Sequence, residues 1–162
     1  MAKHIVSVLV ENKFGVLARI SSLIAGRGFN IDSLAVGETE DPTASRMTIV
    51  VDGDDKTIEQ VKKQLNRLID VISIQDLTRE EHLDRELLFC KVSVTPKTRP
   101  ELVEIAETLK GEITDVGVKT MTIQLVGDQT KVKTLLELVK PYGIKEIVRT
   151  GRIAISRESG GG

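Results

Sequence analysis

The order of hydrophobic and polar positions in the first half of the chain predicts alternating strands and helices. Apolar residues at every second position indicate strands, and apolar residues three and four positions apart indicate helices that bury one face. Val16, Ile20 and Ile24 form such a helical stripe between two segments with the strand pattern. The predicted order is strand, helix, strand, strand, helix, strand, over about residues 3–10, 15–26, 30–38, 45–52, 55–68 and 70–77.

The same order recurs in the second half, after a stretch that is almost wholly polar. Pro100 suits the first turn of a helix, where its missing N–H costs nothing. Gly111 suits the end of that helix, because glycine readily takes the left-handed backbone of a helix cap. The elements are expected over about residues 86–95, 100–110, 112–118, 120–126, 128–140 and 144–156.

Two βαββαβ units of roughly 75 residues predict an α+β protein. Each unit is expected to be a ferredoxin-like sandwich, a sheet with two helices on one face, and the two follow in tandem. Domains this small bury only about 60% of their unfolded surface, so we expect them to associate with each other or with a second chain. The predicted boundaries are a first domain over 1–78, a linker over 79–85, a second domain over 86–157 and a flexible tail over 158–162.

Composition and charge narrow the function classes. The 162 residues include 23 Lys and Arg against 24 Asp and Glu, a net charge of −1 that gives no reason to expect nucleic acid or an anionic membrane as a partner. The single cysteine, Cys90, excludes an internal disulfide, and its apolar neighbours predict a buried thiol. No signal peptide and no apolar run of about 18 residues is visible. The sequence therefore predicts a cytoplasmic protein without a membrane partner.

The chain lacks the residue patterns of common catalytic and metal sites. His4 and His82, its two histidines, lie at a strand start and in the linker, and both are expected to be solvated. None of the patterns H-x-x-x-H, G-x-S-x-G and G-x-x-x-x-G-K-[ST] occurs. The acidic residues within 38–41 and 52–55 are expected to be turn and helix-start carboxylates, not metal ligands. Only four aromatic side chains are present, too few to suggest base stacking on a sheet.

The polar loop between the first strand and the first helix is the best candidate for a ligand site. The loop begins with Glu11 and Asn12 directly after the strand, and Gly15 opens the helix. A first helical turn offers unpaired N–H groups and the positive end of the helix dipole, which suit a carboxylate. The amide of Asn12 both donates and accepts hydrogen bonds, as a zwitterionic amino acid requires. The loop is also explained as a βα turn that Asn12 stabilises locally, and spacing alone leaves both interpretations open.

Three segments of the first unit together resemble a known family. They are Glu11-Asn12-x-x-Gly15-Val16-Leu17-x-Arg19-Ile20, then Arg27-Gly28-Phe29-Asn30-Ile31-Asp32-Ser33-Leu34, then Ser45-Arg46-Met47-Thr48. The chain resembles the regulatory (small) subunits of acetohydroxyacid synthase, also called acetolactate synthase. Its first unit resembles an ACT domain, a ferredoxin-like module that binds amino acids. The second unit matches more by topology and length than by any motif.

The resemblance implies a regulatory protein without catalysis of its own, in the biosynthesis of valine, isoleucine and leucine. It implies a large catalytic subunit as partner, whose activity the chain would raise and make sensitive to feedback inhibition, usually by valine. The chain would need no cofactor of its own, because thiamine diphosphate, Mg and FAD would belong to the catalytic subunit. Two other classes stay open: a stand-alone enzyme with a site between the units, and an amino-acid sensor that binds DNA or RNA.

Strand order sharpens the expected effector site. A βαββαβ sheet has the order 4-1-3-2, so Asn12, after strand 1, and Asn30, at the start of strand 2, lie at opposite ends of the sheet. Strand 2 is an edge, and an edge invites pairing with a second chain. An antiparallel homodimer about a twofold axis would bring the partner's Asn30 to the Asn12 end, with two equivalent sites. Each site would then hold one effector through Asn12, Gly15, Val16 and Leu17 of one chain and Asn30 and Ile31 of the other.

Overall fold

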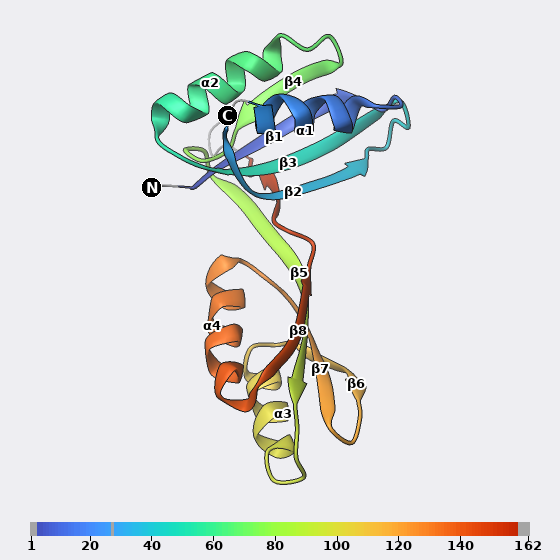
Figure 1. Cartoon of the computed structure of the whole chain (residues 1–162), viewed down its shortest axis with the longest axis vertical. Helices are drawn as coiled ribbons and strands as arrows, with labels where there is room; N and C mark the ends of the chain where they lie inside the picture. Colours follow the sequence, from blue (N-terminus) through green and yellow to red (C-terminus); the bar gives the residue numbers. More distant parts are fainter. Residues whose placement is uncertain (1–2, 27, 159–162) are drawn as a thin grey trace. The chain divides into compact units, whose positions relative to one another are not determined.

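The structure, a computed structural model, describes residues 3–26 and 28–158, and divides into two compact units. The first unit comprises Met1–Leu83 together with Arg152–Gly162, and the second comprises Asp84–Gly151 (Figure 1). The predicted tail lies outside the described residues from position 159 onward. Among the described residues, none of the helices combines the length and the hydrophobicity needed to cross a membrane.

The first unit is a four-stranded antiparallel sheet in the order β2-β3-β1-β4, as predicted. Both of its helices pack on one face of that sheet, and their buried residues Ile20, Ile24, Ile58 and Leu65 share a core with the central strand. The elements are β1 (Lys3–Glu11), α1 (Val16–Gly26), β2 (Asn30–Glu38), β3 (Ala44–Asp52), α2 (Asp55–Asn66) and β4 (Val71–Asp76).

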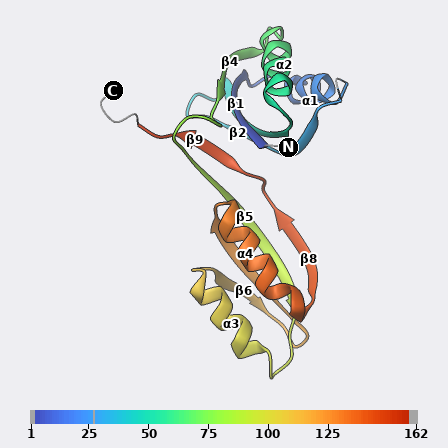
Figure 2. The ribbon, with the colours of Figure 1, turned by 90° about the vertical axis from the view of Figure 1, so that its left-hand side faces the viewer.

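The second unit repeats this topology, with the sheet order β6-β7-β5-β8. Figure 2 shows α3 and α4 on the same face of its sheet. Its core includes Cys90, which is fully buried as predicted, and burial raises the pKa of this thiol. The elements are β5 (His82–Ser93), α3 (Arg99–Thr108), β6 (Glu112–Val116), β7 (Thr120–Gly127), α4 (Gln129–Val139), the 3₁₀ turn η1 (Lys140–Tyr142) and β8 (Ile144–Arg149).

Two predictions at the junction of the units were wrong. The segment 79–85 is a linker only in part, because β5 already begins at His82. The single strand predicted over 144–156 is two strands. The strand is interrupted around Gly151, whose φ of 79° is a left-handed backbone conformation. After this break, β9 (Ile153–Ser156) belongs to the first unit, and the second unit ends at Gly151 instead of residue 157.

The C-terminal strand β9 covers part of the sheet face that carries no helix. Ala154 of β9 packs against the buried side chains of Ile5, Val50 and Leu77. The strand also pairs with β5, and the N–H of Arg157 donates to the carbonyl oxygen of Glu81 at 2.9 Å. The alternation of the sequence could not predict this return, because a four-residue strand with one small inward residue resembles a continuation of β8.

His4 is buried, contrary to the prediction that it is solvated. Its relative exposure is 4%, and neither ring nitrogen has a hydrogen-bond partner within the described part of the chain. The reason is its place on β1, where it lies opposite Val51 of β3. Successive side chains on a strand alternate between faces, so His4 shares the helix-covered face with Val6 and Val8.

A buried ion pair in the second unit gives a test of the fold. The Glu86 side chain on β5 is 1% exposed, and it accepts hydrogen bonds from Nη2 and Nε of Arg149 on β8, the latter at 3.3 Å. Arg149→Met leaves that carboxylate buried without a partner. We expect it to lower the free energy of unfolding by about 2–3 kcal/mol.

The double variant Glu86→Leu with Arg149→Met removes both charges and is expected to recover most of that loss. Urea unfolding of the single and double variants measures the difference. A double variant as unstable as Arg149→Met alone would show that the ion pair does not carry the effect.

Candidate functional site

A groove of about 500 Å³ opens in the first unit where β1 ends and α1 begins. Its wall on the far side is the end of β2, the edge strand of the sheet. The apolar part of its lining comes from β1, α1, β2 and β3, through Val10, Val16, Leu17, Val36 and Met47. Val10, Val16 and Met47 are buried, whereas Leu17 and Val36 remain 44% and 48% exposed. The groove therefore has a buried apolar floor and a partly exposed apolar rim.

Asn12 fixes the loop on one side of this groove. Its backbone N–H donates to the carbonyl oxygen of Thr43 at 2.7 Å. Its side-chain Nδ2 donates to the carbonyl oxygen of Pro42 at 3.0 Å and to Glu38 Oε1 at 3.3 Å. Asn12 thus stabilises the turn locally, which is one of the two roles considered from the sequence. Its Oδ1 accepts no hydrogen bond from any described residue and lies at an exposed position.

The first turn of α1 presents donors to the groove. Gly15 takes a φ of 84°, a backbone conformation that favours glycine, and the helix begins at the next residue. A Cβ at Gly15 would meet Arg19 Nη1 at 3.5 Å, so backbone conformation and not close packing calls for glycine here. The N–H groups of Leu17 and Ala18 have no hydrogen-bond partner in the described chain, and no acidic residue stands in the first turn. This turn can accept an anion.

Charges of both signs line the groove. Lys13 Nζ lies 2.9 Å from Glu11 Oε2, and this hydrogen bond and the attraction of the carboxylate raise the pKa of Lys13 above its ordinary value. Glu38, at the end of β2, adds a second carboxylate. A ligand with a carboxylate, an ammonium group and an apolar side chain would find a counterpart here for each part.

The structure brings three of the predicted residues together and leaves two apart. Asn12, Val16 and Leu17 line the groove, and Gly15 lies between them in the chain. Asn30 is exposed opposite Asp52, whereas Glu11, next to Asn12, lies opposite Ala44. These ends of β3 are eight residues apart, roughly 26 Å at about 3.3 Å per residue. The prediction that Asn12 and Asn30 lie at opposite ends of the sheet is therefore confirmed.

Ile31, beside Asn30, is partly buried against the helix-side core. Its predicted contact is with the effector in the site of a partner chain, and that contact stays a prediction. The sequence analysis missed three groove residues on β1 and its loop, Val10, Glu11 and Lys13. It also missed those from β2 and β3: Val36, Gly37, Glu38, Ser45 and Met47. The predicted strand order already indicated that β2 contributes to the groove, because β1 and β2 run in the same direction and must finish at the same end of the sheet.

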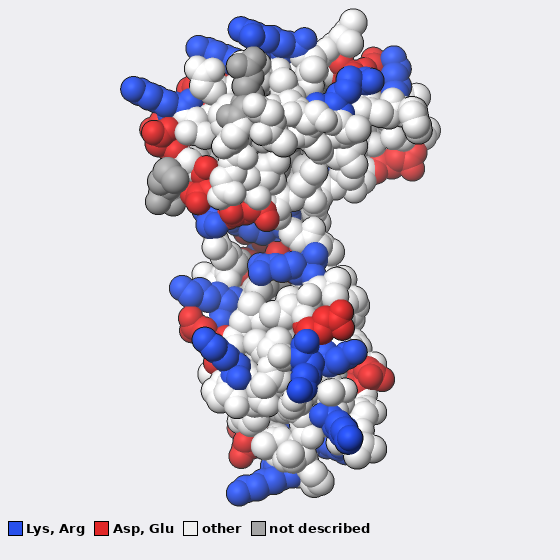
Figure 3. Space-filling view, viewed as in Figure 1, with Lys and Arg blue, Asp and Glu red and all other residues white. Residues whose placement is uncertain are grey.

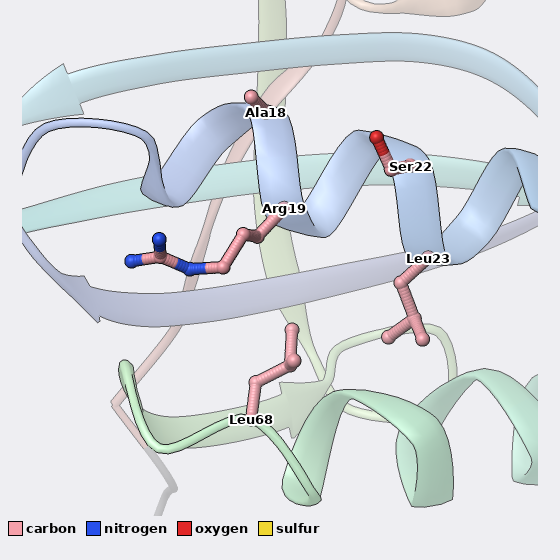
Figure 4. Close-up of a pocket in the computed structure, with 5 residues that line it drawn as sticks. All are labelled: Ala18, Arg19, Ser22, Leu23 and Leu68. Atoms are coloured by element: carbon pink, nitrogen blue, oxygen red, sulfur yellow. The ribbon is translucent and has the colours of Figure 1, made fainter.

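A second hollow, of about 470 Å³, lies on another side of α1. In Figure 4, Leu23 of α1 and Leu68 face each other, and Arg19 extends toward the start of the helix. The guanidinium of Arg19 is already engaged, because Nε and Nη2 donate to Asp70 Oδ2 at 2.9 and 2.8 Å. Ala18, whose N–H has no partner in the described chain, borders this hollow, but the rest of its surface is largely apolar and the charge of Arg19 is compensated. The described residues of its lining therefore offer a zwitterionic ligand no free charged side chain.

Acidic residues within 38–41 and 52–55 act in a turn and a helix cap, as predicted. Asp41 Oδ1 accepts hydrogen bonds from the hydroxyl and N–H of Thr43, which lower the pKa of that carboxyl. Asp54 caps α2 by accepting from the N–H of Thr57 at 2.8 Å, which likewise lowers its pKa. No group of three or more potential metal ligands occurs among residues 3–26 and 28–158.

Comparison with known proteins agrees with the architecture of both units. Residues 6–73 match the family model described as an AHAS small subunit-like ACT domain, where AHAS is acetohydroxyacid synthase. Residues 85–158 match the model described as the small subunit of acetolactate synthase. The crystal structure of the acetolactate synthase small subunit from Thermotoga maritima superposes with a TM-score of 0.89. It is 38% identical and covers 98% of this chain and 99% of its own.

Two relatives match along nearly the whole chain. The acetolactate synthase small subunit of Aquifex aeolicus is 51% identical over 96% of this chain and 82% of its own length. The probable acetolactate synthase small subunit of Archaeoglobus fulgidus is 49% identical over 96% and 97%. The resemblance seen in the sequence is confirmed, and with it the ACT domain and the second ferredoxin-like domain. The chain belongs to the family of acetolactate synthase small subunits.

Proposed function

We propose that this chain is a non-catalytic regulatory subunit that binds the large catalytic subunit of acetolactate synthase, raises its activity and makes it sensitive to valine. The observation that carries the proposal is the groove of the first unit. It joins an unfilled helix N-terminus, an exposed carboxylate at Glu38 and an apolar floor, the three features that a branched-chain amino acid requires. Thiamine diphosphate, Mg and FAD belong, in this proposal, to the catalytic subunit.

The effector site is completed by a second copy of the chain. β2 has a strand neighbour on one side only among the described residues, and its outer edge is free to pair. An antiparallel β2–β2 pair centred on Leu34 places the partner's Asn30 opposite Glu38, beside the groove. Asn12, Gly15, Val16 and Leu17 of one chain and Asn30 and Ile31 of the other then surround one effector, with two such sites in each homodimer.

This arrangement links effector binding to the state of the dimer. A ligand held by both chains binds the paired state more tightly than the separate chains, and so shifts the equilibrium toward that state. The catalytic subunit senses the effector through this shift, without any contact between the effector and the catalytic centre. Activation needs only the folded chain, so activation and feedback inhibition are separable.

The variant Gly15→Asp tests the placement of the effector carboxylate. The wild-type chain is expected to raise the turnover of pyruvate by the catalytic subunit, and valine to reduce it. In Gly15→Asp the added carboxylate repels the effector carboxylate at the start of α1, so activation is kept and inhibition by valine is lost. Gly15→Asn is the matched control, because asparagine also tolerates a positive φ and has the same size without the charge.

Steady-state assays of pyruvate turnover, with and without the catalytic subunit and with and without valine, test these expectations. Inhibition by valine that persists in Gly15→Asp would contradict the placement of the carboxylate. Turnover of pyruvate by the small chain alone would contradict its non-catalytic role.

Effector selectivity tests the apolar floor. One methylene group in such a pocket is worth about 1–3 kcal/mol, so valine, leucine and isoleucine should differ by no more than roughly 10- to 200-fold in affinity. Alanine leaves much of the floor uncovered and should bind more weakly than valine. Isothermal titration calorimetry of the wild-type chain measures the series, and equal affinities for alanine and valine would argue against this pocket.

Mixed dimers test whether the site is shared. Asn12→Ala and Asn30→Ala are each expected to abolish valine binding, because each leaves a charged group of the effector without a partner. A heterodimer of the two variants contains one site with both lesions and one wild-type site, so it should bind about one valine. If both asparagines served a site within one chain, every site of the heterodimer would carry a lesion.

Titration of the mixed sample with valine, after chain exchange is shown by native mass spectrometry, decides between these geometries. Asn12 also donates to the carbonyl oxygen of Pro42, so thermal unfolding of each variant serves as the control for folding. Exchange without recovery of binding would overturn the shared site.

A further inference from the structure

A groove of about 380 Å³ lies between α4 and β8 of the second unit. Its lining includes four apolar side chains, Val132 and Leu136 of α4 and Ile144 and Ile147 at β8. Val132 is buried, and Ile147 is 38% exposed. The groove is thus a strip of apolar surface directly beside a strand at the edge of the sheet.

The rim of this groove is basic. Lys133 of α4 and Lys140 of η1 line it and are exposed, with Glu137 between them in the sequence. Residues 129–149 hold five Lys and Arg (positions 131, 133, 140, 145 and 149) against two Glu (137 and 146), although the whole chain is balanced at 23 against 24. Since Arg149 is paired with buried Glu86, the excess is carried by lysines. Figure 3 shows basic side chains, with acidic ones interspersed, over uncharged surface on one face of this unit.

The strand beside the groove has a free row of backbone groups. β8 pairs with β5 and has no neighbour on its other side among the described residues. The N–H of Thr150 donates to Leu87, and Val148 lies opposite Phe89 in the same register. Residues along an antiparallel strand direct their N–H groups alternately toward and away from the partner strand. The N–H and carbonyl groups of Ile147 therefore point away from β5, where an added strand would bind them.

We infer that an extended segment of the catalytic subunit, with carboxylates and alternating apolar side chains, adds to β8 and lies in this groove. The backbone of the segment pairs with the outer edge of β8, its apolar side chains cover Leu136 and Ile147, and its carboxylates meet Lys133 and Lys140. Pairing of an extended peptide with a sheet edge, with pockets for alternate side chains, is a recurrent mode of recognition.

This inference rests on the proposed function for its partner and assigns a role to the second unit. The effector groove lies wholly in the first unit, so a contact through β8 leaves the effector site free. Nucleic acid is the weaker occupant, because none of the described residues that line the groove is aromatic and no base could stack there.

A charge-reversed pair of variants tests the inference. Lys133→Glu with Lys140→Glu is expected to weaken binding of the purified catalytic subunit at least tenfold and to reduce the salt dependence of that binding. The matched control is Lys97→Glu with Lys119→Glu, which makes the same charge change at exposed positions of the same unit away from the groove. The control is expected to bind like the wild type, and both double variants should bind valine with unchanged affinity.

Ile147→Pro adds a test of the strand pairing. Proline removes the outward N–H of β8 without removing a hydrogen bond to β5, and it should weaken binding of the catalytic subunit by a similar factor. Circular dichroism and thermal unfolding check that each variant is folded.

The outcomes separate the two proposals. Wild-type binding of the catalytic subunit with equal binding by Lys133→Glu/Lys140→Glu would overturn the β8 site and leave the regulatory role intact. Failure of the wild-type chain to bind the catalytic subunit would overturn the regulatory role and, with it, this site. Loss of single-stranded RNA binding in the variant, with unchanged binding of the catalytic subunit, would assign the groove to nucleic acid and overturn the inference.

Discussion

The hydrogen bonds at the end of β1 are the constraint on which the first unit depends. Glu11 donates its N–H to the carbonyl oxygen of Asp70 at 2.8 Å, and Asn12 donates to Thr43 and Pro42. The end of the central strand is therefore joined to the loops on both sides of it. Because α1 begins four residues after Asn12, these bonds also fix where the first helical turn starts and which way its free N–H groups point. The groove is a consequence of this fixed end.

The order of the strands explains why a groove at the end of β1 is also lined by β2, the edge strand of the sheet. β3 separates β1 from β2 in the sheet, so β1 and β2 run in the same direction and both end beside the groove. Within one chain, a ligand in the groove can reach the start of α1 and the end of β2. The start of β2 lies eight residues before that end, at the other end of the sheet. A ligand enclosed on the open side of the groove must be covered by something outside the chain. In the proposed homodimer, an antiparallel copy of β2 would supply that cover with the residues that the chain's own topology keeps remote.

Much of the fold follows from the sequence because its determinants are local. The stripe of Val16, Ile20 and Ile24 fixes α1, and all three side chains are buried. The β9 segment is different, because its assignment depends on the apolar patch of Ile5, Val50 and Leu77, which forms only when distant parts of the chain have folded. His4 is a similar case, since its burial depends on the core that the helices form over the same face of β1 as Val6 and Val8. Long-range packing, which no local sequence pattern reveals, determines both the placement of β9 and the burial of His4.

The candidate site divides in the same way. Asn12 and Gly15 could be found from the sequence because a polar loop before a helix and a glycine at its start have local physical reasons. The contributions of Val36 and Glu38 depend on the register between β2 and β3, where a shift occurs between Ile31 and Ser33. Such a shift changes which side chains of β2 reach the groove, and alternation alone does not place it.

The two units also show why one fold supports different roles. The first turn of α1 contains no acidic residue, and its Leu17 and Ala18 N–H groups lack partners among the described residues. The corresponding helix α3 begins at Arg99 and has Pro100, which lacks an N–H, in its first turn. The same turn carries Glu101, whose carboxylate offsets the helix dipole. The helix start in the second unit is thus compensated by its own sequence, whereas that of the first unit leaves its donors open. A ligand carboxylate gains most where the chain supplies none, so the proposed effector site fits the helix start of the first unit, although both units share the same topology.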